Sequence, residues 1–399
     1  MVTFFKREDA LLYLLLLGIA LRVLVYLILP PLGDSAQTDV IQFILEKGRL
    51  PLTSELPAAG QPPLYYLLAS LFARFDEPGS QKAQQLLSLL LSVGSLYFLY
   101  QLSKQLLSEV LLRNGSFLLA AVLPSFLLGS LTVSNTALTY FLGILLLWVL
   151  SKYIHQPSQT HEIALAVVLG LGILTQGTFL VLGLPLVVVV ALVLWKVDAA
   201  AKLIFFRLLL FALIALTIGT YKYLENYYIE GRFFIPDPAM ASEPLGTFLA
   251  QAGTLYSAFW QPEAEGTSSS LSSRYLRPVI FLLALLPTLL ILLGFVVKSV
   301  SVLRFLSKLK KSNRTYFAKR LEEGTWLLLL VLTGVWFFRN ASPATAMLGL
   351  SFFPLMYLLY LGFRFLHESA AALLQVGYLL WLGLAGLYVL HYGLLGFGG

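Results

Sequence analysis

The chain has 399 residues, of which 58% are hydrophobic and only 12% are charged, and its formal net charge is +7. A soluble domain of this composition would expose large apolar patches, so a soluble globular protein is excluded. Several windows of about 20 residues, the length that crosses a bilayer core, are almost free of charge. They predict an all-α polytopic membrane protein, because a β-barrel would alternate polar and apolar residues.

About eleven apolar segments are long enough to be transmembrane helices (roughly 10–13 with uncertain ends). They are residues 11–29, 82–103, 115–131, 135–152, 161–175, 178–195, 202–221, 277–298, 324–339, 343–364 and 370–395. Segment 62–75 is too short to cross and is expected to lie on the outer surface as an amphipathic or re-entrant helix. Residues 1–399 are expected to form a single transmembrane domain.

Basic residues favour a cytoplasmic N-terminus, because Lys6 and Arg7 precede the first span and the connector 298–323 is strongly basic. Two large loops, residues 30–81 and 222–276, then lie outside the cytoplasm. They hold most of the carboxylates. We expect a multi-pass protein of a prokaryotic inner or plasma membrane, with its active surface at these loops.

Arg22 lies inside the first predicted span, about 12 Å of helical rise before Pro30. An arginine at this depth is costly and normally has a partner or a water-filled cavity. Two interpretations are equally supported: Arg22 binds a lipid phosphate, or its side chain extends outward to the membrane surface.

Asp34 and Asp39 follow the first span in the first outer loop. Asp34 is a candidate general base for an acceptor hydroxyl or amine, although a lone aspartate before a helix is more often an N-cap. Asp39 is either a second acid or lies on the wet side of that helix. The apolar residues of the helix, spaced to lie in the membrane interface, are Val40, Ile41, Phe43 and Ile44.

The motif QPPLYY at residues 61–66 is the second feature of this loop. Its prolines fix an extended entry into a helix, which would hold Gln61 and Tyr65 near the loop as candidates for substrate binding. The motif alone more often marks an ordinary helix start with interfacial aromatic residues.

The second outer loop contains Asn226, a candidate for substrate binding, and two arginines, Arg274 and Arg277, mark the start of the next span. Paired guanidinium groups before a span can bind a phosphate, but more commonly anchor the chain to lipid headgroups. Trp260 and its aromatic neighbours suit stacking on a sugar or, more often, the interfacial belt.

Metal chemistry has little support in the sequence. The chain has no cysteine, which excludes disulfides and thiolate metal sites. His155 and His161 have a spacing near that of metal ligands, but they lie in a polar connector where solvation is the more frequent state. No metal site is predicted.

Taken in order, the motifs resemble those of the GT-C fold membrane glycosyltransferases, in the branch of protein O-mannosyltransferases and aminoarabinose transferases. The segments that carry the resemblance are GD followed by GRLP, PPLYYLL, PSFLLGSLTVSNTAL, GLGILTQGTFLVLGLP and ENYYIEGRFFIPD. The resemblance implies a GT-C-like bundle in which Asp34 is the catalytic base. It also implies a sugar donor on a polyprenyl phosphate and an acceptor outside the cytoplasm.

The sequence departs from this family at four positions. The family commonly has histidine or lysine where this chain has Gln61, often aspartate where it has Asn135, and a lysine where it has Gln176. Where a Gly-Arg-Tyr signature is expected, only Arg339 is nearby. These departures leave fewer cations for a donor phosphate, with Arg22, Arg274 and Arg339 as the remaining candidates.

The leading hypothesis is a membrane glycosyltransferase that uses a polyprenyl-phosphate sugar, with Asp34 as base and Asp39 assisting the acceptor or a divalent metal. The alternative is a catalytically inactive GT-C-like subunit of a membrane complex, and a lipid transporter or flippase is the third. The expected partners are the lipid-linked donor and membrane lipids, with other membrane subunits under the alternative. No nucleic-acid partner and no certain cofactor are predicted.

Overall fold

The computed structural model describes residues 2–28, 31, 33, 35–74, 81–197, 199–233, 253, 256, 259–260, 271–306, 320–332 and 344–369. Within these residues the regular secondary structure is helical, and an isolated bridge joins Gly33 to Val133. The predicted span 370–395 lies outside the described residues, as does the end of the predicted span 324–339.

Six helices of the described part are long and apolar enough to cross a membrane, which confirms the predicted polytopic helical class. They are α2 (Ala10–Ile28), α5 (Gln81–Leu106), α8 (Asn135–His155), α10 (Thr178–Lys196), α11 (Ala201–Gly219) and the stretch Ala284–Arg304 of α14 (Leu271–Leu306). Shorter apolar helices are α6 (Val110–Val122), α9 (Gln159–Ile173) and Phe352–Phe365 within α16 (Ala344–Ser369). The number of eleven spans stays a prediction.

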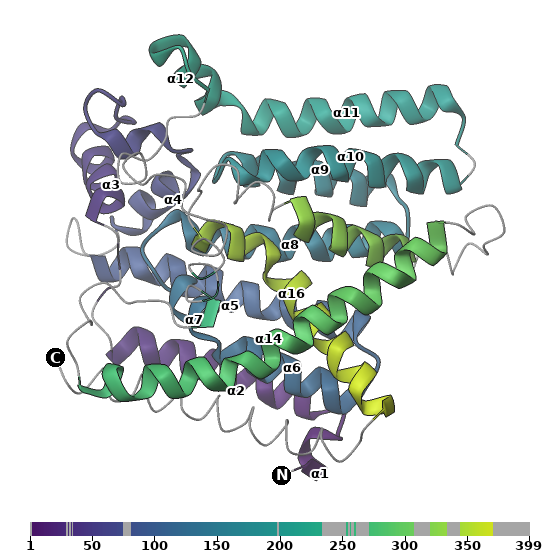
Figure 1. Ribbon diagram of the computed structural model, residues 1–399. Coiled ribbons are helices and arrows are strands. Elements are labelled where there is room, and N and C mark those ends of the chain that lie inside the picture. The colour runs from purple at the N-terminus through teal and green to yellow at the C-terminus, as the bar shows by residue number, and fades with distance from the viewer. Residues whose placement is uncertain are drawn as a thin grey trace.

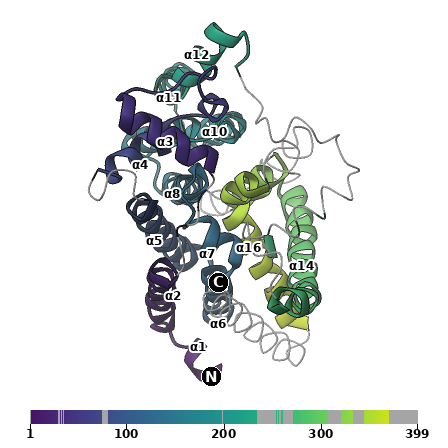
Figure 2. The same cartoon turned by 90° about the vertical axis from the view of Figure 1, so that its left-hand side faces the viewer.

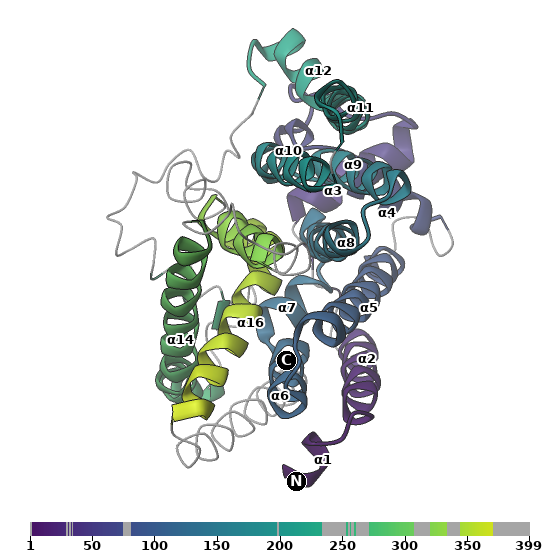
Figure 3. The same cartoon turned by 90° about the vertical axis from the view of Figure 1, so that its right-hand side faces the viewer.

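The helices form a row with a pair beside it. Viewed along the bundle, α11, α9, α8, α5 and α2 follow one another, α10 packs against α9 and α11, and α14 and α16 lie together to one side (Figures 2 and 3). Helix α16 joins the two parts, because it packs against α14 on one side and against α8 and α6 on the other. One hydrophobic core runs through these elements.

Glycine allows α14 and α16 to approach at backbone distance. A Cβ atom added at Gly294 would lie 1.9 Å from the carbonyl oxygen of Leu358, and one at Gly362 would lie 2.0 Å from that of Leu290. Small residues at a crossing of membrane helices permit this kind of contact. The close crossing of α14 and α16 therefore requires glycine at both positions.

The predicted span 115–131 is wrong as a single helix. The structure divides this region into α6 and the short helix α7 (Pro124–Gly129). The break lies at Leu123, whose ψ is 127°, and the following proline has no N–H with which to continue the hydrogen-bond ladder. Hydropathy alone did not detect the break, because the whole segment is apolar.

Two helix boundaries also differ from the sequence prediction. The second outer loop begins with a helix, α12 (Tyr221–Glu230), and its predicted end at residues 271–276 already belongs to α14. Helix α12 ends at Gly231, whose φ of 70° is the left-handed conformation that glycine adopts without strain. The polar composition of these segments concealed their helical structure.

Candidate functional site

The first outer loop folds against one end of the bundle. It consists of α3 (Ser35–Lys47), the 3₁₀ turn Pro57–Gly60 and α4 (Leu64–Phe72), which Figure 1 shows together beyond the row of long helices. The expectation that the apolar face of α3 lies in the membrane interface is wrong. Val40, Ile41 and Ile44 are buried, and α3 packs against α4. The expected short helix in segment 62–75 is confirmed as α4, only 9 residues long.

Gln61, at the entry to α4, connects this loop to the start of α8. Its Oε1 accepts hydrogen bonds from the hydroxyl of Tyr66 at 3.1 Å and from Nδ2 of Asn135 at 3.0 Å. The backbone N–H of Asn135, which has no partner within its own helix, donates to Oε1 of Gln37 on α3 at 2.9 Å. Two glutamines from the loop therefore fix the first turn of α8.

The same network extends to the turn between α9 and α10. The hydroxyl of Thr139 lies 2.9 Å from the carbonyl oxygen of Asn135 and 2.7 Å from Oε1 of Gln176. We call Gln37, Gln61, Asn135 and Gln176, bridged by Tyr66 and Thr139, the amide cluster. All six side chains are uncharged. Gln61 and Gln176 are half-buried, whereas the other four are buried.

Helix α12 of the second outer loop docks beside the cluster. Nδ2 of the buried Asn226 donates to the carbonyl oxygen of Gly60, the residue before Gln61, at 2.9 Å. Its Oδ1 is buried and makes no hydrogen bond in the described structure. On the same helix, Lys222 and Glu225 form an ion pair of 2.5 Å. The predicted candidates Gln61 and Asn226 are thus brought together.

Tyr65 does not face the loop. Its buried hydroxyl lies 2.9 Å from Oγ of Ser88 on α5, and that serine donates to the carbonyl oxygen of Thr132 at 2.7 Å. The following residue, Tyr66, is the tyrosine that contacts Gln61. The contact with Gln61 thus belongs to Tyr66, and the substrate-binding role expected of Tyr65 stays a prediction.

Arg22 is fully buried and does not extend to the membrane surface. Its Nε donates to Oγ of Ser92 at 2.7 Å, and its Nη1 donates to the carbonyl oxygens of Gly18 at 3.2 Å and Ala121 at 3.0 Å. The guanidinium also lies 4.8 Å from the ring centroid of Phe126. These contacts connect α2 to α5, α6 and α7.

Of the remaining predicted site residues, the structure describes Asp39 and the backbone of Arg274. Asp39 is exposed on the face of α3 opposite the buried Gln37. Asp34 and Arg339 lie outside the described residues, and so does the side chain of Arg274, whose backbone belongs to the first turn of α14. Trp260 is buried, and its indole N–H donates to Oγ1 of Thr288 on α14 at 3.0 Å. It therefore serves as a packing residue.

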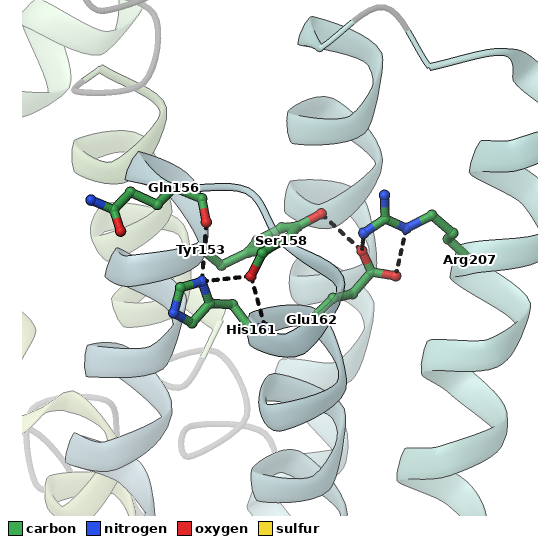
Figure 4. A network of polar contacts seen from close by, with 6 residues as sticks. All are labelled: Tyr153, Gln156, Ser158, His161, Glu162 and Arg207. Carbon is green, nitrogen blue, oxygen red and sulfur yellow. Dashed lines mark hydrogen bonds and ion pairs between the residues drawn. The ribbon is translucent and has the colours of Figure 1, made fainter.

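A second polar cluster lies at the opposite end of α8 and α9, and the sequence did not single it out. Figure 4 shows Glu162 between Arg207 and Tyr153. Its Oε2 accepts from Nη2 of Arg207 at 2.5 Å and from the hydroxyl of Tyr153 at 3.2 Å. Because Glu162 is buried, this pair fastens α11 to α8 and α9. An acidic residue in the first turn of an otherwise apolar helix was the available signal.

The two histidines of the predicted polar connector have separate partners. Nδ1 of His161 lies 2.9 Å from Oγ of Ser158, and Nε2 of His155 lies 3.7 Å from Oε2 of Glu322 (Figure 4 shows the first contact). Among the described residues there is no group of three or more His, Cys, Asp or Glu side chains that could hold a metal ion.

Known proteins resemble the chain over the region that contains this site. A family model described as dolichyl-phosphate-mannose-protein mannosyltransferase matches residues 60–219, which include Gln61, Asn135 and Gln176 of the amide cluster. No curated protein matches the sequence.

Solved structures extend the resemblance to the fold of nearly the whole chain. The oligosaccharyltransferase of Archaeoglobus fulgidus, in complex with Zn and sulfate, superposes with a TM-score of 0.54 at 13% identity, covering 95% of this chain and 52% of that one. The same archaeal protein, AglB, in complex with an inhibitory peptide and a dolichol-phosphate gives 0.53 at 14% identity, with 96% and 55% covered. ArnT from Cupriavidus metallidurans bound to undecaprenyl phosphate gives 0.45 at 11% identity, with 92% and 79% covered.

The chain spans about half the length of the archaeal oligosaccharyltransferase. Its helices have the GT-C fold of that membrane glycosyltransferase, which confirms the predicted fold class.

Proposed function

We propose that the chain is a membrane glycosyltransferase that moves a sugar from a polyprenyl-phosphate donor to an acceptor outside the cytoplasm. The observation that carries this proposal is the match of residues 60–219 to a mannosyltransferase family model within a GT-C fold. A solved structure of the archaeal protein of that fold is in complex with a dolichol-phosphate, a lipid of the class that the proposal requires. The amide cluster then faces the extracytoplasmic side.

Asp34 is the proposed general base. The bridge between Gly33 and Val133 brings the residue before Asp34 beside the connector that leads into α8, two residues from Asn135. The carboxylate takes the proton of the acceptor hydroxyl while the acceptor oxygen bonds to the anomeric carbon. The bond from that carbon to the phosphate oxygen breaks, polyprenyl phosphate leaves, and the single displacement inverts the anomeric configuration.

The other candidates take supporting roles in this proposal. Asp39 is exposed on α3 and is assigned to the acceptor side. Arg274 and Arg339 are assigned to the donor phosphate, since guanidinium groups form paired hydrogen bonds with phosphate oxygens. Arg22 is not assigned to it, because its Nε and Nη1 groups already donate to groups inside the bundle. No step requires a metal ion.

The test is transfer from a labelled polyprenyl-phosphate sugar by the full chain in lipid nanodiscs. Asp34→Asn should lower the transfer rate by about 100-fold or more, because it removes the base without changing the size of the side chain. Asp9→Asn is the matched control, since Asp9 is exposed near the N-terminus. Transfer by Asp34→Asn at the wild-type rate would refute the assignment.

A second function, that of a GT-C-like subunit without catalysis, is favoured by the neutrality of the amide cluster. Positions where the resembling family carries charge are occupied by neutral amides: Asn135 donates to Gln61, and Gln176 accepts from the hydroxyl of Thr139. Such a subunit would show no transfer in either variant. It would co-purify with one fixed membrane partner, and Asp34→Asn would leave that co-purification unchanged.

A further inference from the structure

The amide cluster presents polar groups that its own hydrogen bonds leave free. The Oε1 atom of Gln61 accepts two hydrogen bonds and that of Gln176 accepts one. Among the described residues no hydrogen bond uses the Nε2 group of either glutamine or the Oδ1 atom of Asn135. Because Gln61 and Gln176 are only half-buried, a ligand can reach them. The cluster therefore offers both donors and an acceptor.

Two further polar atoms next to the cluster are buried without a partner. They are Oδ1 of Asn226, which bonds through its other amide atom to the residue before Gln61, and Oγ1 of Thr178, two residues after Gln176. Buried polar groups in proteins are normally satisfied, by protein or by ordered water. A water molecule or a hydroxyl-bearing ligand would satisfy these two atoms.

The charge of the cluster selects the kind of ligand. All six of its side chains are neutral, and the nearby Lys222 is engaged in an ion pair with Glu225. A phosphate moved here would lose its hydration without gaining a cation, which is strongly unfavourable. It would also face the acceptor oxygen of Asn135 with like partial charge. A sugar hydroxyl both donates and accepts, so it can satisfy all of these groups.

We infer that the amide cluster binds the uncharged ring of a sugar through its hydroxyl groups, and that phosphate is bound elsewhere. The inference rests on the proposed function only for the source of that sugar, which is the donor or the acceptor. Gln61 and Gln176 supply the donors, and Asn135 supplies the acceptor. These three residues act as binding residues that determine specificity.

The experiment measures ligand binding without turnover, so it is independent of catalysis. The full chain in nanodiscs is titrated with uncharged methyl hexosides and pentosides and, separately, with inorganic phosphate, using saturation-transfer NMR. At least one glycoside should bind at the cluster, and any phosphate binding, which the inference places elsewhere, should not change in the leucine variants of the cluster. Gln61→Leu and Gln176→Leu should each weaken glycoside binding by up to about tenfold, the worth of one or two neutral hydrogen bonds. Gln42→Leu, on the exposed face of α3, is the control and should bind as the wild type does.

A charged variant should exchange the two ligand preferences of the cluster. Gln176→Lys should lose glycoside binding and gain phosphate binding, because it adds the missing cation. The inference is overturned if Gln61→Leu or Gln176→Leu weakens phosphate binding, if the wild type binds no glycoside, or if the leucine variants bind the glycoside as Gln42→Leu does. If transfer is observed, a raised KM for the donor or for the acceptor in Gln176→Leu identifies the source. Glycoside binding without transfer would refute the glycosyltransferase and leave this inference standing.

Discussion

Arg22→Lys tests whether the buried arginine is a structural connection or a ligand for the donor phosphate. A lysine keeps the charge but has one ammonium group, which cannot reach Ser92 on α5 and the carbonyl of Ala121 on α6 together. Ala121 is in the last turn of α6, where the break at Leu123 ends the helical ladder, so its carbonyl oxygen depends on the arginine at 3.0 Å.

The size of the effect follows from these contacts. Leaving the carbonyl of Ala121 unsatisfied costs about 1–3 kcal/mol, and losing the guanidinium over the ring of Phe126 costs about 1 kcal/mol. Ser92 loses less, because its hydroxyl is also 2.6 Å from that of Ser130. The sum is about 2–4 kcal/mol, a large part of the 5–15 kcal/mol that typically separates folded from unfolded protein.

Unfolding in a dodecyl sulfate titration, followed by tryptophan fluorescence, measures this loss. The surface variant Arg7→Lys is the matched control and should unfold like the wild type, since Arg7 is exposed. In the transfer assay, Arg22→Lys should leave the KM for the donor unchanged. An unaltered unfolding midpoint together with a strongly raised donor KM would refute the structural role and place Arg22 at the phosphate.

Three further changes test other contacts, each in the same titration unless stated. Gly294→Ala should destabilise the chain by about 1–3 kcal/mol or more through overpacking. Gly183→Ala is the control, because a Cβ there would meet nothing within 4 Å, and it should shift stability by less than about 1 kcal/mol. Equal effects of the two variants would contradict the α14–α16 contact. Arg207→Met should cost about 3 kcal/mol because it leaves the buried Glu162 unpaired, and adding Glu162→Gln should recover part of that loss. In the first outer loop, Arg49 forms hydrogen bonds with the carboxylate of Glu55, and they lower the pKa of Glu55 from 4.5 to about 2. The contribution of this pair to folding stability should therefore be complete above pH 4.5 and disappear as the pH falls through about 2. An NMR titration of the Glu55 side chain would follow this change. Titration near 4.5 would show that the pair is not formed.

The membrane class and most spans could be predicted because a helix that crosses the bilayer core needs about 20 residues almost free of charge. The prediction failed where backbone geometry decides the outcome, as at Leu123, where an apolar run contains a helix break. It also failed where burial depends on a distant segment. The apolar face of α3 looked interfacial because the sequence does not show that α4 covers it. Likewise, nothing in the motif shows that Tyr65 contacts Ser88 whereas Tyr66 contacts Gln61.

The amide cluster illustrates why a site can be invisible in sequence although three of its four amides are noticed. Gln61, Asn135 and Gln176 appeared as three separate losses of charge, on segments far apart in the chain. The fold shows that they share one network, which explains why the losses occur together. A single remaining charge among these amides would lack a counterion and cost several kcal/mol, whereas neutral amides avoid that cost. If this chain transfers sugar, the donor phosphate must then be held outside the cluster, and replacing Arg274 or Arg339 should weaken phosphate binding where replacing Gln176 by leucine does not.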